Sequence, residues 1–214
     1  MERNVKVSKA VLKRLPGYLA YLKSLPDTAP ANISATALAN ALDMGEVQVR
    51  KDLALVSSGG RPKIGYNRAA LIADIEQFLG YDNTTDAVLI GAGKLGLALM
   101  AYTGFEAYGL NIQAAFDIAP SIEKTEDGQP VYPITKLEHY CKLHKVLMGI
   151  ITVPASAAQG VADMLIAGGV KAIWNFAPTH LDVPDNILVQ NENMATSLAV
   201  LSVHLRAAMK EEKK

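Results

Sequence analysis

Hydrophobic residues in the first 80 positions recur at helical spacing, in short segments separated by polar turns. The segment Ser8–Lys23 places leucines and a valine three or four residues apart, which predicts a first helix. Ser34 is a suitable N-cap for a second helix over residues 35–42, and a third follows over 46–56. Two short helices separated by a three-residue turn that contains Gly45 have the spacing of a helix-turn-helix unit.

A glycine-rich stretch follows the third helix. Residues 57–66 read Ser-Ser-Gly-Gly-Arg-Pro-Lys-Ile-Gly-Tyr, which is too rich in glycine for a helix and predicts a hairpin or wing that carries two cations. A fourth helix over 67–79 ends at Gly80, and the polar stretch 81–86 then marks a domain boundary. We therefore predict a winged-helix domain over residues 1–80.

From residue 87 onward, short apolar runs alternate with helical segments. This alternation predicts an α/β domain over residues 85–192, with a parallel sheet and helices on its faces. The predicted strands are 87–90, 112–116, 146–153, 172–174 and 187–190, and the predicted helices are 95–102 and 157–167. A mostly apolar helix over 194–209 closes the chain and gives a third region, residues 193–214.

The net charge of zero conceals an asymmetry between the two predicted domains. Residues 1–68 hold eleven Lys and Arg against five Asp and Glu, whereas residues 69–214 hold ten against sixteen. A basic N-terminal third is what nucleic-acid binding at one end of the chain would need. A solvated basic surface has the same charge, so charge alone does not decide between them.

Composition also bears on the compartment. Cys141 is the single cysteine, so an internal disulfide is excluded and a reducing cytoplasm is expected. No apolar run approaches the roughly 18 residues that span a bilayer, and the N-terminus lacks the apolar core of a secretory signal. We predict a cytoplasmic protein without a membrane segment.

The strongest motif is Gly91-Ala92-Gly93-Lys94-Leu95-Gly96, between a predicted strand and a predicted helix. Gly91 permits a tight turn, Gly93 lets the backbone approach a pyrophosphate, and Gly96 allows close helix–strand packing. Asp117 follows at the end of the next strand, where a carboxylate can accept hydrogen bonds from both hydroxyls of an adenine ribose. This carboxylate would repel a 2′-phosphate, so the motif predicts NAD(H) as the cofactor rather than NADP(H).

Residues for catalysis or for a metal site are scarce. None of the four histidines lies beside an Arg or Asp in a pattern that suggests an oriented acid–base pair. His139, Cys141 and His144 lack a fourth ligand, and His139 would point away from the other two on a helix. About 130 residues remain after the first domain, enough for a cofactor domain alone. We therefore predict no metal site, and a sensor rather than an enzyme.

Candidate DNA contacts lie in the third helix and the wing. They are Gln48, Arg50, Lys51 and Asp52, followed by Arg61 and Lys63. Gln can pair with adenine and Arg with guanine in the major groove, while Lys neutralises phosphate. The alternative is that these are solvated charges on an amphipathic helix.

Taken together, these motifs resemble the redox-sensing transcriptional repressor family Rex, over nearly the whole chain. Gln48-Val49-Arg50-Lys51-Asp52-Leu53 matches the recognition-helix motif of that family, and Gly65-Tyr66 resembles the end of its wing. Similar segments follow in the family's order: Gly91–Gly96, Tyr102-x-Gly104-Phe105, Phe116-Asp117, Val153-Pro154-Ala155 and Asn175-Phe176-Ala177-Pro178.

The resemblance implies a homodimer that binds double-stranded operator DNA when NADH is low and releases it when NADH binds. It implies a Rossmann fold for the second domain and a terminal helix exchanged between subunits. It also implies that Val153, Pro154, Asn175 and Phe176 line the nicotinamide end of the pocket. On the same basis we count Tyr102 among the cofactor-binding residues and Tyr66 among the DNA-binding residues.

Some positions depart from the family pattern. Residues 54–62 replace the aromatic segment usual before the wing, and Ala20 and Asn193 stand where charged residues are common. The polar link between domains is therefore expected to be made differently here. Two other functions stay open: a small NAD-dependent oxidoreductase and a CoA-binding regulatory module.

Overall fold

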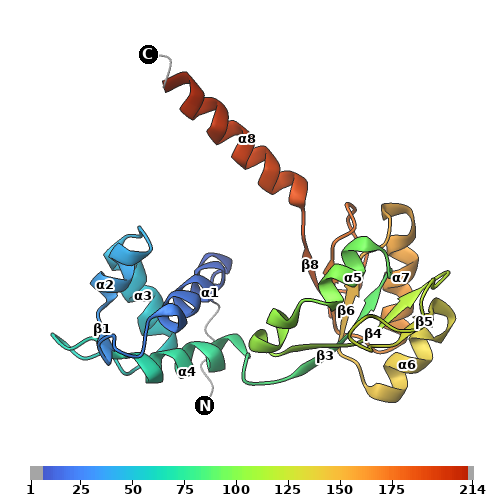
Figure 1. Cartoon of the computed structure of the whole chain (residues 1–214), viewed down its shortest axis with the longest axis horizontal. Coiled ribbons are helices and arrows are strands. Elements are labelled where there is room, and N and C mark those ends of the chain that lie inside the picture. The colour runs from blue at the N-terminus through green and yellow to red at the C-terminus, as the bar shows by residue number, and fades with distance from the viewer. Residues whose placement is uncertain (1–6, 212–214) are drawn as a thin grey trace. The chain divides into compact units, whose positions relative to one another are not determined.

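The computed structural model describes residues 7–211. It divides the chain into two compact units, Met1–Asn83 and Thr84–Lys214 (Figure 1), with the boundary between the predicted limits of 80 and 85. The final helix belongs to the second unit and does not form a unit of its own. Residues 1–6 and 212–214, which the predicted first and third regions included, lie outside the described residues.

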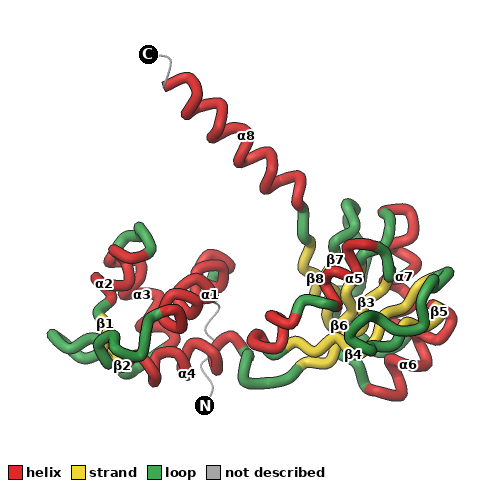
Figure 2. Tube along the Cα trace, in the orientation of Figure 1, coloured by secondary structure: helices red, strands yellow, loops and turns green. Residues whose placement is uncertain are grey.

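The first unit is mostly helical (Figure 2). Its elements are α1 (Lys9–Ser24), β1 (Asn32–Ile33), α2 (Ala35–Ala41), α3 (Glu46–Val56), β2 (Tyr66–Asn67) and α4 (Arg68–Leu79). Ser34 caps α2 as predicted, since its hydroxyl accepts a hydrogen bond of 3.0 Å from the Ala37 N–H. The turn between α2 and α3 contains Asp43 in the left-handed region, at φ 51°, and the predicted helix-turn-helix is confirmed.

One apolar core joins the four helices of this unit. Its fully buried side chains include Leu15 and Leu22 of α1, Leu38 of α2, Leu53 of α3, and Leu71 and Ile75 of α4. Burial of one such side chain stabilises the fold by about 1.5–3 kcal/mol. Because α3 packs inward through Val49 and Leu53, its opposite side is left at the surface.

The second unit is built on a six-stranded sheet in which every pairing is parallel. The strands are β3 (Thr85–Ile90), β4 (Leu110–Asp117), β5 (Val131–Pro133), β6 (Met148–Ile151), β7 (Ala172–Asn175) and β8 (Leu188–Asn191), in the order β5-β4-β3-β6-β7-β8. The helices are α5 (Lys94–Met100), α6 (Leu137–His144) and α7 (Ala155–Ala167), with short 3-10 turns at Thr103–Tyr108 and Ile134–Lys136. The predicted strands are all present, whereas β5 and the bounds of α6 were not anticipated.

Side chains of the central strand alternate between two cores, one on each face of the sheet. Ala87 and Leu89 of β3 join the core that contains Met100 of α5. Val88 and Ile90 join the opposite core, beneath α6 and α7. A strand that is buried on both faces reads as a continuous apolar run, which is why β3 was recognisable in the sequence.

The last helix, α8 (Met194–Glu211), has the apolar composition of a buried helix but not its environment. All side chains over residues 195–210 are exposed. They include Leu198, Leu201, Val203 and Leu205, each more than half exposed. An apolar surface of this kind is typical of a contact site.

Candidate functional site

The turn after β3 needs glycine at two positions. Gly91 has φ +102°, and a Cβ there would lie 2.9 Å from the Thr152 carbonyl oxygen. A Cβ on Gly96 would lie 2.0 Å from the Gly91 carbonyl oxygen, so a side chain at this position would push α5 off the strand. Both requirements agree with the roles predicted from the motif.

The third glycine faces open space. Gly93 is exposed at the N-cap of α5, and a Cβ built on it would meet no atom within 4 Å. Lys94 and Leu95 follow it at the surface, while Ala92 is half-buried. The outer side of the turn is therefore free to receive a bulky group close to the backbone, which a side chain at Gly93 would obstruct.

This turn lies where the order of the strands reverses. The chain runs outward from β3 to β4 and β5 on one side, and from β6 to β7 and β8 on the other. The Thr152 hydroxyl, just after β6, lies 3.0 Å from the Ile90 carbonyl oxygen and 2.9 Å from that of Gly91. It ties the two diverging halves together at the crevice where open parallel sheets bind their ligands.

Asp117 ends β4 beside the glycine turn. Its Oδ2 accepts a hydrogen bond of 2.8 Å from the Ala92 N–H, and its Oδ1 accepts one of 2.9 Å from the Ala119 N–H. The residue is half-buried, and the next side chain, Ile118, is 86% exposed. Each carboxylate oxygen accepts more than one hydrogen bond, so the group can still take the two hydroxyls of a ribose.

A row of aromatic rings packs on the core that covers one face of the sheet. Tyr102 contacts Phe105 at 4.8 Å between ring centroids, Phe105 contacts Trp174 at 5.6 Å, and Trp174 contacts Phe176 at 4.8 Å. Both predicted residues, Tyr102 and Phe176, belong to this row through these ring contacts. Tyr102 is exposed and Phe176 is half-buried. Phe105 and Trp174 were not predicted as site residues, because an isolated aromatic residue in a sequence more often indicates core.

Val153 and Pro154 follow β6 and lead into α7, where Val153 is half-buried and Pro154 is exposed. A Cβ on Gly91 would lie 3.0 Å from Val153 Cγ1. The structure therefore brings Val153 against the glycine turn, at the same end of the sheet as Asp117, and Pro154 follows it as the N-cap of α7.

Asn175 ends β7 in the interior of the second unit. Its side chain is fully buried: the amide nitrogen donates to the Thr179 carbonyl at 3.0 Å and to Asn191 Oδ1 at 2.8 Å. Its Oδ1 accepts from the Ala177 N–H at 3.0 Å. The side chain holds the loop that carries Phe176, and its predicted place at the nicotinamide end of the pocket stays a prediction.

In the first unit, the exposed side of α3 carries most of the predicted DNA contacts. Gln48, Arg50 and Lys51 are all exposed. Arg50 forms an ion pair with Glu46 one turn earlier on the helix, a surface contact worth only about 0.3–0.5 kcal/mol. These side chains can reach a ligand without unfolding any part of the core.

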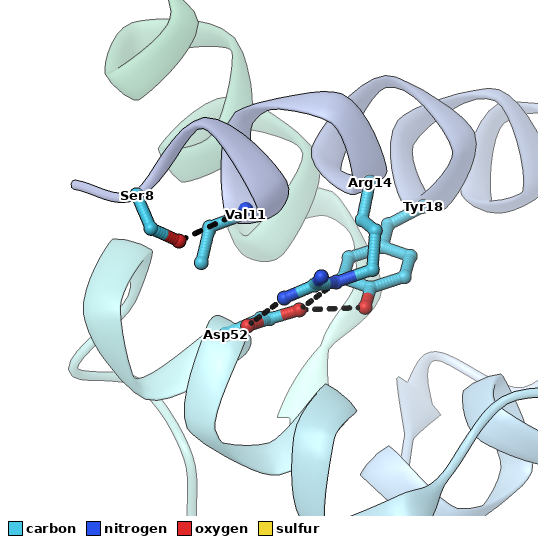
Figure 3. Close-up of polar contacts among 5 residues, drawn as sticks. All are labelled: Ser8, Val11, Arg14, Tyr18 and Asp52. Atoms are coloured by element: carbon cyan, nitrogen blue, oxygen red, sulfur yellow. Dashed lines mark hydrogen bonds and ion pairs between the residues drawn. The ribbon is translucent and has the colours of Figure 1, made fainter.

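Asp52, also a predicted DNA contact, does not belong to this exposed set. It is 3% exposed and accepts from Arg14 Nε at 2.7 Å, from Arg14 Nη2 at 2.9 Å and from the Tyr18 hydroxyl at 2.8 Å. Figure 3 shows both α1 side chains pointing at this carboxylate. Its hydrogen bonds raise the pKa of Arg14, and burial together with the bond to Asp52 raises the pKa of Tyr18 to about 12.

A groove of about 480 Å³ lies between α1 and the start of α3. It is lined by Arg14, Gly45, Val47, Gln48, Lys51 and Asp52. Arg14 and Val47 were not predicted from the sequence to lie beside the candidate DNA contacts. Arg14 lies in another helix, and Val47 has the residue type of a core position. Val47 is nevertheless 63% exposed.

The predicted wing is a short hairpin. Arg61 and Gly65 exchange two backbone hydrogen bonds of 2.9 Å, and Lys63 at its tip has φ 65°. Arg61 and Lys63 are exposed, as DNA contacts must be. Tyr66 is not: it is 9% exposed and pairs with Ile33 in the sheet, and its side chain packs in the core of the first unit.

Within residues 7–211, no group of three or more His, Cys, Asp or Glu side chains has the arrangement of a metal site. Cys141 is buried, which raises the pKa of its thiol to about 11. His144 packs on Tyr140, with ring centroids 4.1 Å apart. No helix in the described part of the chain has the length and apolar character needed to cross a membrane.

Two family models match the chain. The family described as "CoA binding domain" matches residues 82–179, and "Putative DNA-binding protein N-terminus" matches residues 6–54. The two matches fall in the two structural units.

The chain is similar over almost its full length to proteins of one name. The redox-sensing transcriptional repressor Rex of Porphyromonas gingivalis is 41% identical over 199 residues, which cover 92% of this chain and 91% of that protein. Rex of Clostridium beijerinckii is 40% identical over 203 residues, which cover 94% and 96%.

Solved structures agree with this similarity. RSP in complex with β-NAD⁺ and operator DNA is 34% identical, with a TM-score of 0.89 over 98% of this chain and 97% of that chain. RSP in complex with β-NADH, also 34% identical, has a TM-score of 0.86 over 98% of this chain and 99% of that one. The chain thus belongs to the Rex family of redox-sensing transcriptional repressors.

Proposed function

We propose that this chain binds operator DNA through α3 and the wing, and that NADH binding at the glycine turn releases the DNA. One observation carries the proposal: the open turn at Gly93 lies beside Asp117, in a chain whose other unit exposes Gln48, Arg50 and Lys51 on a helix-turn-helix. RSP, a Rex-family repressor, has been solved with NAD⁺ and operator DNA and with NADH. The family consists of repressors, not enzymes.

The residues present fit a dinucleotide. The backbone of residues 91–96 would hold the pyrophosphate, Asp117 would accept the ribose hydroxyls, and Val153 and Pro154 would border the nicotinamide. When bound, the cofactor supplies a nicotinamide ring that is cationic in NAD⁺ and neutral in NADH. If Val153, Phe176 and the neighbouring aromatic rings form the nicotinamide end of the pocket, they would distinguish these two forms.

We further propose that the protein is a homodimer held together by α8. The exposed leucines and valines of this helix need a partner of matching apolar character, and exchange of the helix between two copies would provide one. Truncation after Asn193 should then yield a monomer or a loose dimer that binds DNA weakly and ignores NADH. Light scattering and a DNA-release titration on the truncated protein test this; a tight dimer that still responds to NADH would contradict it.

A second ligand has one observation in its favour, namely the match of residues 82–179 to a family described as "CoA binding domain". Asp117 opposes the 3′-phosphate of CoA less directly than it opposes the 2′-phosphate of NADPH. Parallel calorimetric titrations with NADH, NADPH and CoA separate the alternatives. We expect the tightest binding with NADH.

The central experiment is a mobility-shift assay on promoters of genes for anaerobic NADH reoxidation, with and without NADH. We expect a retarded protein–DNA complex that dissociates when NADH is added and stays intact when NAD⁺ is added. Operator DNA as the target also assigns the protein to the cytoplasm of the bacterial cell. Retention of the complex at saturating NADH would overturn the proposed switch.

A further inference from the structure

Trp174 lies in the row of aromatic rings of the second unit and carries an N–H group. Its ring contacts Phe105 at 5.6 Å and Phe176 at 4.8 Å between centroids. The indole Nε1 donates a hydrogen bond of 3.0 Å to Glu192 Oε1, at a partly buried position. The N–H of a buried tryptophan usually has a partner, and here the partner is a carboxylate 18 residues later in the chain.

The half-buried Glu192 carboxylate depends on this contact. Its other side-chain donor, Gln190 Nε2, is farther away, at 3.4 Å. Among the residues that the structure describes, no ion pair joins Glu192 to a lysine, an arginine or a histidine. The indole is therefore its closest side-chain donor, and a hydrogen bond to an ionised acceptor is stronger than one between neutral groups.

Glu192 lies where the chain leaves the sheet for α8. Its backbone N–H donates to the Asn175 carbonyl oxygen at 2.8 Å, which continues the contact of β8 with β7 by one residue. The next residue, Asn193, already caps α8, because its Oδ1 accepts from the Thr196 N–H at 3.2 Å. From residue 195 to residue 210 every side chain is exposed. Within the described part of this segment, Glu192 is thus the last residue whose side chain is bound to the sheet.

The hydrogen bond completes a short path from the aromatic rings to the start of α8. A planar group that binds against Phe176 or Phe105 meets Trp174 one contact further on. Side chains packed at the density of a protein interior transmit such a displacement to their neighbours. When the indole shifts, its N–H shifts with it, and Glu192 must then follow or lose its closest donor.

We propose that Glu192 is a positioning residue for the response to NADH, because it transmits the position of the Trp174 ring to the start of α8. This inference rests on the proposed function, in which the nicotinamide binds beside Phe176 and α8 joins two subunits. The hydrogen bond between Trp174 and Glu192 then couples the two ligands. Without the Glu192 carboxylate, NADH and operator DNA still bind, but NADH no longer lowers the affinity for DNA.

The test is the ratio of the operator affinity without NADH to that at saturating NADH, measured on the full-length protein with fluorescently labelled operator DNA. Saturation ensures that a change in NADH affinity does not enter the ratio. We expect about tenfold or more for the parent and less than about threefold for Glu192→Leu, which has no acceptor. Glu192→Gln keeps an acceptor oxygen and should keep most of the ratio. The control is Glu138→Ala, which removes a carboxylate that pairs with Lys142 on α6, and it should match the parent.

A second variant removes the donor instead of the acceptor. Trp174→Phe keeps an aromatic ring but lacks the N–H, so its ratio should fall as it does in Glu192→Leu, including where that variant does not fold. Trp174 is the single tryptophan of the chain, so its emission spectrum reports on the contact. We expect the spectrum to change in Glu192→Leu and to stay close to that of the parent in Glu192→Gln.

Two results would overturn the inference. One is a full effect of NADH on DNA affinity in Glu192→Leu or, where that variant does not fold, in Trp174→Phe. The other is a loss in Glu192→Gln as large as that in Glu192→Leu, since the amide keeps the hydrogen bond. If NADH leaves the DNA affinity of the parent unchanged, the proposed function itself fails, and that outcome is distinct from variants that respond like a responsive parent.

Discussion

Asp52 in the first unit and Asp117 in the second each accept close hydrogen bonds, but from donors of different kinds. Asp52 is held by a guanidinium and a phenol that belong to another helix, and it is 3% exposed. Asp117 is held by two backbone N–H groups of adjoining turns and stays half-buried at the end of its strand. Three side-chain donor atoms bind the first carboxylate and leave it buried, whereas the second binds two backbone donors and stays partly exposed.

This difference separates a carboxylate that stabilises the fold from one that is available to a ligand. A buried charge that loses its partner destabilises the protein, so Asp52 and Arg14 depend on each other. Asp117 can exchange or add a hydrogen-bond partner without exposing apolar core. The same residue type therefore has opposite expected phenotypes in the two units.

The largest expected effect comes from Arg14→Leu. It leaves the Asp52 carboxylate buried with the Tyr18 hydroxyl as its remaining side-chain donor, and should lower the free energy of unfolding of the first unit by about 3–5 kcal/mol. Urea denaturation followed by circular dichroism measures it, and Asp52→Asn in the same chain should recover part of the loss. A loss below about 1 kcal/mol would mean that the pair behaves like a surface ion pair and would remove the contrast with Asp117.

Lys51→Ala and Arg50→Ala come next. Each should weaken operator binding by about 1–3 kcal/mol per subunit, and both subunits of a symmetric dimer lose the contact. The affinity for NADH should change no more than a few-fold. Both side chains are exposed, so thermal stability should stay close to that of the parent. Filter binding at fixed salt concentration is the measurement, and unchanged DNA affinity in both variants would remove α3 from the proposed interface.

Asp117→Ala tests the carboxylate of the second unit in the comparison with Asp52. NADH binding should weaken about tenfold, or 1.4 kcal/mol, and the preference for NADH over NADPH should narrow because the repelling charge is gone. The free energy of unfolding of the second unit should fall far less in this variant than that of the first unit falls in Arg14→Leu. Isothermal titration with both cofactors checks this; full retention of NADH selectivity would place Asp117 away from the ribose.

The smallest effect at neutral pH concerns Tyr18. Its pKa rises from the ordinary 10.0 to about 12 in the folded protein, so the folded state holds this proton more tightly than the unfolded state. The resulting stability is fully present below about pH 10 and is lost as the pH rises through 12. Denaturation midpoints between pH 8 and 12 should fall more steeply for the parent than for Tyr18→Phe, and parallel curves would show that Tyr18 titrates normally.

Elements with strong local signals could be predicted from the sequence. The cap at Ser34, the turn around Gly45 and the glycine motif at 91–96 each depend on residues a few positions apart. The short edge strand Val131–Pro133 was missed, because three residues do not establish a periodicity.

Which side chains face inward could not be predicted in the same way. Asp52 is turned inward by Arg14, 38 residues earlier, and Asn175 by Asn191, 16 residues later. Tyr66 is covered through its pairing with Ile33. Each of these orientations depends on a distant partner, and local pattern carries no information about such a partner.

The dependence of α3 on α1 limits how this recognition element can be exchanged among repressors. If residues 46–56 were transplanted alone into a different winged-helix scaffold, Asp52 would arrive without Arg14 and Tyr18 to receive it. The recipient would carry an unmatched charge in its interior, which destabilises a fold strongly. The smallest portable unit is therefore the continuous segment from residue 9 to residue 56, which carries Asp52 together with Arg14 and Tyr18.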